Sequence, residues 1–345
     1  VMIWFLGTAL QNEQQHYQML KEYHIGGGVL YSKDLPSKFT QPRNVDSPEQ
    51  LKQLTRVLQA IDSTPMFIAI DEEGGNVKRL DPRDGFIDDM SHQKIGAINN
   101  ADTTRLWANT LASELSDMGI NMNFGPVLDL NVNPENPIIG GRERSFSRYV
   151  DTVLVHGKIF VEEHRKNNIV TVPKHFPGHG SSEKDSHKGL SDISKTWSPK
   201  ELSPFELFIQ EGFTEVIMTC HVYNEIFDTL PATLSPKIIG DLLRGTYGFD
   251  GLIISDDMHM RAISNFYDFE TSIEKALLAG VDMLLFSNNA YPCPEDEPNC
   301  VKIPYDPNIA QKAVDHIYAL VEKGTITEEQ IEKSYQRILK VKQAL

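Results

Sequence analysis

Residues 251–257, GLIISDD, pass from an apolar stretch directly into two carboxylates. Residues 251–255 are predicted to form a strand, because they are apolar on both faces, as a strand is when helices cover both faces of its sheet. Seven more runs of this kind occur, at 2–6, 27–31, 66–70, 120–124, 169–173, 215–219 and 282–286. Segments between them, such as 47–62 and 101–119, carry apolar residues at helical spacing. Eight strands alternating with helices predict an α/β fold, the (β/α)8 TIM barrel.

The length and composition fit one such barrel. The chain has 345 residues, of which 40% are hydrophobic, and it contains no internal repeat, linker or low-complexity tract. We therefore expect a single domain over residues 1–345. The amphipathic segment 327–345 is expected to form a last helix on the outside of the barrel, with no second domain after it.

The charge limits the classes of partner. The formal net charge is −15, whereas nucleic acids and anionic membrane surfaces attract clustered Lys and Arg. No apolar run is long enough to span a bilayer. We therefore expect no nucleic-acid partner and no membrane span.

The three cysteines bear on the compartment. Cys293 and Cys300 flank the short loop CPEDEPNC, which a disulfide could close, while Cys220 ends an apolar run and is expected to be a buried thiol. A disulfide favours a periplasmic or extracytoplasmic location, and a reduced pair in the cytosol is the alternative.

Ionisable residues follow several of the predicted strands. They are Asp71, Asp129, Lys174, His175, His221, Asp256 and Asp257. In a barrel of this kind the active site lies at the carboxyl ends of the strands, so these side chains should converge on one rim. The alternative is that some form salt bridges that stabilise the barrel mouth.

Two motifs at strand ends leave alternatives open. Adjacent strand residues point to opposite faces, so we expect one of Asp256 and Asp257 to take part in the chemistry and the other to have a structural role. Alternatively, both cap the following helix. Asp71 precedes a Gly pair and Arg79, which indicates either a clamp for sugar hydroxyls or a turn with a charged surface.

The stretch KHFPGHGSSEKDSHKGL, residues 174–190, contains three histidines in a long predicted loop. A zinc site would use His175, His179 and His187. A proton-transfer pair would use Asp185 and His187, because a carboxylate on one ring nitrogen leaves the other free to exchange a proton. A solvated polar loop is the third interpretation. A P-loop is excluded, since the Gly-Lys-Ser/Thr ending is missing.

Several motifs together resemble glycoside hydrolase family 3, in particular its bacterial β-N-acetylhexosaminidases of cell-wall recycling. They are DEEGGNVKRL (71–80), NFGPVLDLNVNPENPIIG (123–140), RSFS (144–147), KHFPGHG (174–180) with DSH (185–187), and GFDGLIISDDM (248–258). The resemblance implies a (β/α)8 barrel and a retaining mechanism that needs neither metal nor cofactor. It also implies release of terminal β-linked N-acetylglucosamine from peptidoglycan-derived fragments, and we expect a monomer.

The resemblance also implies roles for residues. Asp256 matches the nucleophile, and His187 matches the general acid/base, with Asp185 as its partner. The positions that match sugar-binding residues are Asp71, Arg79, Arg144, Lys174 and His175. This chain departs from the pattern at IIGGRERSFS (138–147), where the spacing before RSFS is longer. Arg142 therefore competes with Arg144, and we favour Arg144.

Other functions remain open at this point. A phosphorylase could use the same residues, because a histidine repels incoming phosphate less than a carboxylate does. A β-glucosidase of the same family is disfavoured, since this chain has SDDM where those enzymes show SDW. A metal-dependent amidohydrolase-type barrel would need stoichiometric zinc. A non-catalytic sugar-binding protein would need Asp256 or His187 to face away from the cavity.

Overall fold

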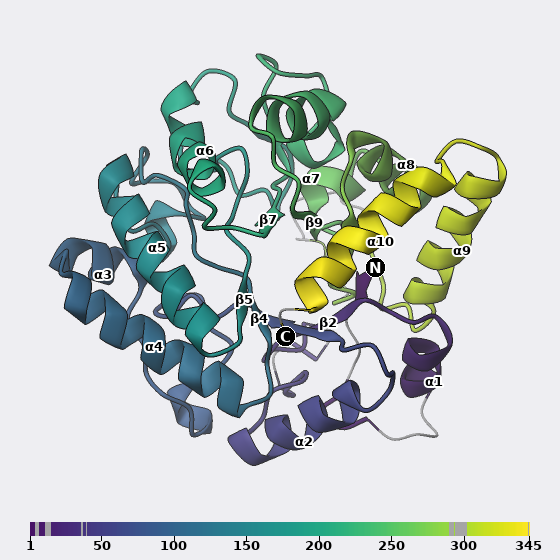
Figure 1. Cartoon of the computed structure of the whole chain (residues 1–345), viewed down its shortest axis with the longest axis horizontal. Coiled ribbons are helices and arrows are strands. Elements are labelled where there is room, and N and C mark those ends of the chain that lie inside the picture. The colour runs from purple at the N-terminus through teal and green to yellow at the C-terminus, as the bar shows by residue number, and fades with distance from the viewer. Residues whose placement is uncertain are drawn as a thin grey trace.

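Eight parallel strands form the centre of the molecule and helices surround them (Figure 1). The computed structural model describes residues 1–3, 7–10, 15–35, 37–38, 40–289, 293, 302–343 and 345. The central strands are β1 (Met2–Ile3), β2 (Gly27–Leu30), β3 (Phe67–Ile70), β4 (Met122–Asn123), β5 (Val170–Thr171), β7 (Val216–Met218), β9 (Leu252–Asp257) and β10 (Met283–Phe286).

The strands close into a barrel. They are neighbours in chain order, and β1 pairs with the last strand, β10, in parallel. Between β5 and β7 the ring is joined by backbone hydrogen bonds, from Phe176 N–H to Met218 O at 2.9 Å and from Met218 N–H to Pro173 O at 3.0 Å. The predicted (β/α)8 fold is confirmed. All eight predicted strands are present. Seven have shorter bounds than predicted, whereas β9 begins one residue later and ends two residues later than the predicted 251–255. Residues 4–6 of the first predicted strand lie outside the described part of the chain.

Helices follow the strands on the outside of the barrel. They are α1 (Gln15–Glu22), α2 (Pro48–Gln59), α3 (His92–Ile98), α4 (Ala101–Asp117), α5 (Val150–Lys166), α6 (Ser203–Gln210), α7 (Arg261–Ser264), α8 (Phe269–Ala279), α9 (Ile309–Glu322) and α10 (Glu328–Lys342). Shorter elements are the 3-10 turns η1 (Pro82–Asp84), η2 (Gly140–Arg142), η3 (Pro199–Leu202) and η4 (Ala232–Leu234), the π-helix η5 (Lys237–Thr246), and a two-stranded ribbon of β6 (Ser191–Asp192) and β8 (Val222–Tyr223).

The predicted helices at 47–62 and 101–119 correspond to α2 and α4. Ser47 caps the first of them, since its side chain accepts the N–H of Gln50 at 3.3 Å. Within the described ranges, no helix combines the length and the apolar character that a bilayer crossing requires.

Apolar side chains of the strands alternate between two cores, as period-2 geometry requires. Residues such as Phe67, Ala69 and Ile254 fill the barrel interior. Their neighbours Ile68, Ile70 and Ile253 pack outward against the helices. Both sets are buried, which explains why each strand is apolar at consecutive positions.

The last helix does not simply lie on the outside of the barrel, as the sequence led us to expect. Val341 of α10 belongs to the interior cluster, and the Lys342 ammonium lies 5.2 Å from the centre of the Phe67 ring at the start of β3. The end of α10 therefore covers the opening at the amino ends of the strands (Figure 1). Amphipathic periodicity predicts an apolar face but not which apolar surface receives it.

The cysteines are only partly accounted for. Cys220 is a free, fully buried thiol, as expected, and burial raises its pKa well above the ordinary value. Cys300 lies outside the described residues, so the disulfide with Cys293 stays a prediction.

Truncating Val341 should destabilise the barrel, because the apolar cluster at its closed end loses contacts that water does not replace. We expect Val341→Ala to lower the free energy of unfolding by roughly 1–3 kcal/mol. The exposed Lys340 on the same helix provides the control, and Lys340→Ala should change stability by less than about 0.5 kcal/mol. Urea unfolding followed by circular dichroism measures both; equal stabilities would show that α10 does not close the barrel.

Candidate active site

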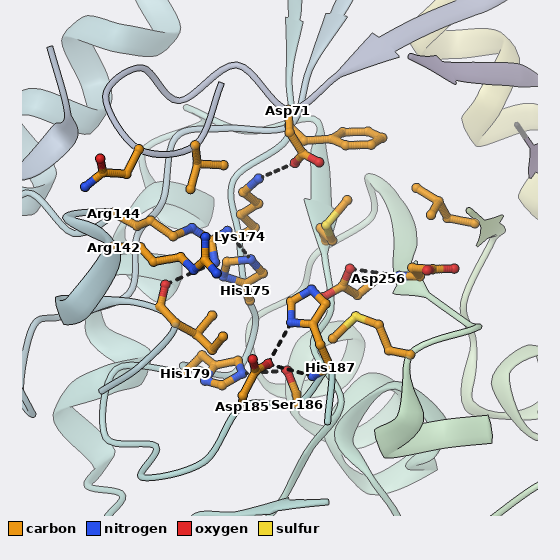
Figure 2. Close-up of a pocket in the computed structure, with 18 of the residues that line it drawn as sticks. Asp71, Arg142, Arg144, Lys174, His175, His179, Asp185, Ser186, His187 and Asp256 are labelled. Atoms are coloured by element: carbon orange, nitrogen blue, oxygen red, sulfur yellow. Dashed lines mark hydrogen bonds and ion pairs between the residues drawn. The ribbon is translucent and has the colours of Figure 1, made fainter. Parts of the chain in front are cut away.

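A cavity of 320 Å³ lies at the carboxyl ends of the strands (Figure 2). This volume is within the range of small-molecule sites. All eight residues that the resemblance singles out line the cavity: Asp71, Arg79, Arg144, Lys174, His175, Asp185, His187 and Asp256. The folded chain thus brings together residues that are up to 185 positions apart (256 − 71). Their convergence is observed, whereas their catalytic roles remain predictions.

Asp71 follows β3 and binds two cations. Its Oδ1 accepts a hydrogen bond from Lys174 Nζ at 2.7 Å, and its Oδ2 accepts one from Arg79 Nη2 at 3.0 Å. Burial by itself would raise the pKa of this carboxyl, but the charges of Lys174 and Arg79 outweigh burial and hold the pKa at about 2. Asp71 is therefore ionised throughout the physiological range.

Glu73 completes this charge network, and the sequence reasoning missed it. Its carboxylate accepts two hydrogen bonds from Arg144, at 2.9 Å from Nε and 2.8 Å from Nη2, and lies 2.7 Å from Lys174 Nζ. Burial opposes its ionisation, but Arg144 and Lys174 keep its pKa far below the usual range. A usable signal was present, because Glu73 lies two residues after Asp71 and in extended chain shares its face.

Glu72, between these two acids, has a structural task. Its Oε2 accepts the backbone N–H groups of Arg79 at 2.7 Å and Leu80 at 3.0 Å, while burial raises its pKa to about 8. The intervening turn needs glycine, since Gly75 has φ +61° and an added Cβ would lie 2.4 Å from Ser91 Cβ. In the DEEGG motif, Asp71 and Glu73 thus belong to the charge network, whereas Glu72 and Gly75 support the turn.

His175 lies between a carboxylate and a guanidinium group. Asp129 Oδ2 lies 2.6 Å from His175 Nδ1, and Arg144 Nη2 lies 3.0 Å from its Nε2. Because arginine can only donate, the arrangement assigns the ring hydrogen to Nδ1 and a lone pair to Nε2. Asp129 also accepts the backbone N–H of His179 at 2.7 Å, so this acid organises the loop after β5.

The loop's second histidine is buried and serves as a clamp. His179 Nδ1 lies 2.7 Å from Ser182 Oγ, and its Nε2 lies 3.1 Å from Ser186 Oγ. Burial lowers the pKa of His179 to about 4, so the ring is neutral near pH 7. The three histidines of the zinc interpretation are thus each bound to a different set of protein groups. In the part of the chain that the structure describes, no three His, Cys, Asp or Glu residues are grouped to hold a metal ion.

Asp185 and His187 form the expected pair. His187 Nδ1 and its backbone N–H both lie 2.8 Å from Asp185 Oδ1. Burial would raise the pKa of Asp185, but the hydrogen bond and charge of His187 lower it below its usual range. The His187 side chain is 44% exposed, and no described residue forms a hydrogen bond with its Nε2. That nitrogen is available to a substrate.

Asp256 and Asp257 differ in their surroundings. Asp256 lines the cavity and accepts the N–H of Asp257 at 2.8 Å. Burial disfavours its charge, but His221 above all, then His175 and His187, lower its pKa below the usual range. Asp257 Oδ1 accepts two backbone N–H groups, from His259 at 3.0 Å and Ser287 at 2.8 Å. Both acids line the cavity, and Asp257 in addition supports the backbone. That Asp256 is the chemical one of the two stays a prediction. The helix-cap alternative is wrong, since α7 begins at Arg261 after Met260.

The two competing arginines are placed differently. Arg144 is buried and bound to Glu73 and His175. Arg142 is exposed and lines the same cavity. Figure 2 shows the two guanidinium groups next to each other on the wall opposite Asp256. Which of them contacts a sugar is not decided by position alone, so the preference for Arg144 stays a prediction.

Comparisons with known proteins show which proteins the chain is similar to. The family described as "Glycosyl hydrolase family 3 N terminal domain" matches residues 1–341. A beta-hexosaminidase of Nitrosomonas eutropha is 35% identical over 302 residues, which cover 84% of this chain and 80% of that protein. One of Alkalilimnicola ehrlichii is 33% identical over 317 residues, covering 89% and 85%. A solved family 3 beta-N-acetylglucosaminidase from Paenibacillus is 33% identical with a TM-score of 0.85; the alignment covers 99% of this chain and only 60% of that longer one.

Removing the charge of Glu73 should leave two buried cations partly uncompensated. We expect Glu73→Gln to lower the free energy of unfolding by roughly 3–5 kcal/mol. The exposed Glu135 is a control of the same chemistry, and Glu135→Gln should stay within about 0.5 kcal/mol of the parent. Guanidinium denaturation measures the difference. If both variants unfolded at the parent's midpoint, the buried network would contribute nothing to stability.

Proposed function

The chain belongs to glycosyl hydrolase family 3, and from this premise we propose that it is a retaining β-N-acetylglucosaminidase that acts on peptidoglycan-derived fragments. One observation carries the mechanism: Asp256 at the end of β9 and the Asp185–His187 pair from the loop after β5 line the same cavity. A retaining glycosidase needs a nucleophile and a proton donor at one anomeric carbon. The names of the relatives support N-acetylglucosamine as the sugar that is released. The motif resemblance supports peptidoglycan-derived fragments as the substrate.

In the first step, an oxygen of Asp256 attacks C1 of the sugar and forms a C–O bond. The bond from C1 to the leaving oxygen breaks, and its electron pair stays on that oxygen. His187, as imidazolium, transfers its Nε2 proton to the leaving oxygen and becomes neutral. Asp256 is suited to this role, because its lowered pKa keeps it ionised and it accepts only one N–H from the described residues.

In the second step, neutral His187 takes a proton from water through Nε2. The resulting hydroxide oxygen attacks C1, the bond to Asp256 breaks, and the carboxylate is restored. Two displacements at the same carbon retain the β configuration. Asp185 remains hydrogen-bonded to Nδ1 in both steps, which fixes the ring's tautomer and stabilises the cation that alternates with neutral imidazole.

The sugar is bound by the paired groups of the cavity wall. Asp71, Arg79, Lys174, His175 and Arg144 present acceptors and donors whose geometry is set by their mutual contacts. A hydroxyl group can donate to Asp71 and accept from Lys174 at the same time. Such preorganised polar groups discriminate well against sugars that lack a hydroxyl, because an unmatched buried group loses its partner.

Replacing Asp256 should remove catalysis and spare binding. We expect Asp256→Ala to lower kcat/KM for 4-nitrophenyl N-acetyl-β-glucosaminide by roughly 10³-fold or more, with N-acetylglucosamine affinity little changed. Asp241→Ala, at an exposed position, should retain the parental rate. A 2-acetamido-2-deoxy-5-fluoro glycoside should label the peptide that contains Asp256, detected by mass spectrometry. A label on another peptide would reject Asp256 as nucleophile.

The loss of rate on replacing His187 should depend on the leaving group of the substrate. A nitrophenolate departs with little protonation, whereas a sugar alkoxide needs a proton. We therefore expect His187→Ala to slow hydrolysis of a β-linked disaccharide by roughly 10²–10⁴-fold and to slow formation of the glycosyl-enzyme from 2,4-dinitrophenyl glycoside far less. His24→Ala, on the exposed His24, is the control. Equal losses in this first step with both substrates would contradict the acid/base assignment.

A further inference from the structure

Among the arginines and lysines that line the cavity, one has no ion pair with the described residues. Arg79 is paired with Asp71, Lys174 with Asp71 and Glu73, and Arg144 with Glu73. Arg142 lines the same cavity, yet none of the described residues forms an ion pair or hydrogen bond with its guanidinium. The acid next to it in sequence, Glu143, is engaged elsewhere, since its carboxylate accepts a hydrogen bond from Ser91 Oγ at 2.7 Å.

The backbone of Arg142 lies in a turn that is fixed by hydrogen bonds, although no described residue binds its side chain. Gly141 N–H donates to Asn136 O at 2.8 Å, and Glu143 N–H donates to Gly140 O at 3.0 Å. The Asn136 side chain donates to His179 O at 2.7 Å and accepts the N–H of Ile138 at 2.8 Å. An added Cβ at Gly140 would lie 2.4 Å from Pro134 O. The turn η2 is thus anchored to the loop that carries the catalytic pair, which limits how far Arg142 can move.

The charges of the cavity are also divided in space. Figure 2 places Arg142 beside Arg144 on one wall and Asp256 on the opposite wall, with His175 between them. A negative group on a substrate would be repelled by Asp256 and attracted to Arg142, and the two effects act in the same direction. N-acetylglucosamine itself is neutral and gives this guanidinium no ionic partner.

We propose that Arg142 forms an oxyanion subsite, so that the preferred substrate carries a carboxylate or related anionic group beside the scissile bond. This inference rests on the proposed function and specifies its substrate class. Guanidinium binds carboxylate and phosphate oxygens through paired N–H donors, which a neutral ligand cannot match. Inorganic phosphate is the other source of the same chemistry, because it could enter as the nucleophile in place of water.

The test compares two disaccharides that differ only in charge. Both carry N-acetylglucosamine β-linked to a hexosamine with a lactyl ether, in one as the free acid and in the other as its methyl amide. The parent enzyme should cleave the acid with a kcat/KM about tenfold higher than the amide, mainly through KM. Arg142→Gln should bring the ratio of kcat/KM for acid and amide to about one, because the acid loses its ionic partner and the amide never had one. Arg142→Lys should retain part of the preference.

Arg148 offers a matched control, since it is an exposed arginine six positions away that does not line the cavity. Arg148→Gln removes the same charge from the protein and should keep the full acid preference. A loss of preference in both variants would indicate a general effect of net charge and would overturn the subsite. Equal cleavage of acid and amide by the parent enzyme would overturn a substrate carboxylate as the ligand.

The phosphate arm uses the neutral 4-nitrophenyl glycoside with and without inorganic phosphate. Phosphate-dependent formation of sugar 1-phosphate that Arg142→Gln abolishes would assign the subsite to phosphate instead of a substrate carboxylate. The absence of both an acid preference and a phosphate effect would overturn the oxyanion subsite altogether.

Failure of the proposed function is distinguishable from failure of the subsite. A parent enzyme that releases no N-acetylglucosamine from the aryl glycoside or from either disaccharide would refute the activity. Calorimetric binding of the two disaccharides to Asp256→Ala then still decides the subsite, because acid and amide differ only at the charged group. Tighter binding of the acid that depends on Arg142 supports the subsite, and equal binding rejects it.

Discussion

A largely buried network of two acids and three cations forms one wall of the cavity. Asp71 and Glu73, at the end of β3, share Lys174 from the loop after β5, and Glu73 also binds Arg144 in a bidentate pair. Ions removed from water are tolerated only if each finds a partner in good geometry. Ion pairs therefore hold the loops after β3, β4 and β5 together, and these pairs order the wall that we propose binds the sugar.

A second network begins at Asp129 and extends to the proposed acid/base. Asp129 holds His175 through Nδ1 and His179 through its backbone, and the His179 ring contacts Ser186. Ser186 lies between Asp185 and His187, and its carbonyl accepts the N–H of Ala262 at 3.2 Å, just after β9. The pair is thus connected both to the sugar-binding residues and to the segment that follows Asp256. We infer that His179 is a positioning residue, and its low pKa suits this role because a neutral ring keeps one nitrogen able to accept.

Much of the fold and part of the site could be predicted from the sequence. The strands were found because each is apolar on both faces, and Asp71, Lys174, His175 and Asp256 were found because they follow such strands directly. The resemblance to a family was needed to single out Arg144 and the Asp185–His187 pair. Contacts between distant segments could not be predicted, since they depend on register and loop paths. Glu73 meeting Arg144, and α10 covering the barrel, are of this kind.

The two walls of the cavity suit different tasks of a glycosidase, one the binding of the sugar and the other the breaking of the glycosidic bond. On the wall of Asp71, Lys174 and Arg144, charges compensate one another, so the groups are ordered before a sugar arrives and lose little entropy on binding. On the other wall, no cationic side chain of the described residues is bound to Asp256, and none of them forms a hydrogen bond with Nε2 of His187. In the proposed mechanism those groups change charge or bonding as the reaction proceeds, and full compensation would oppose that change. Arg142 lies beside Arg144 on the first wall but differs from its neighbours there, because no described residue forms an ion pair with it. Its free charge is therefore best explained by a group that the substrate brings with it.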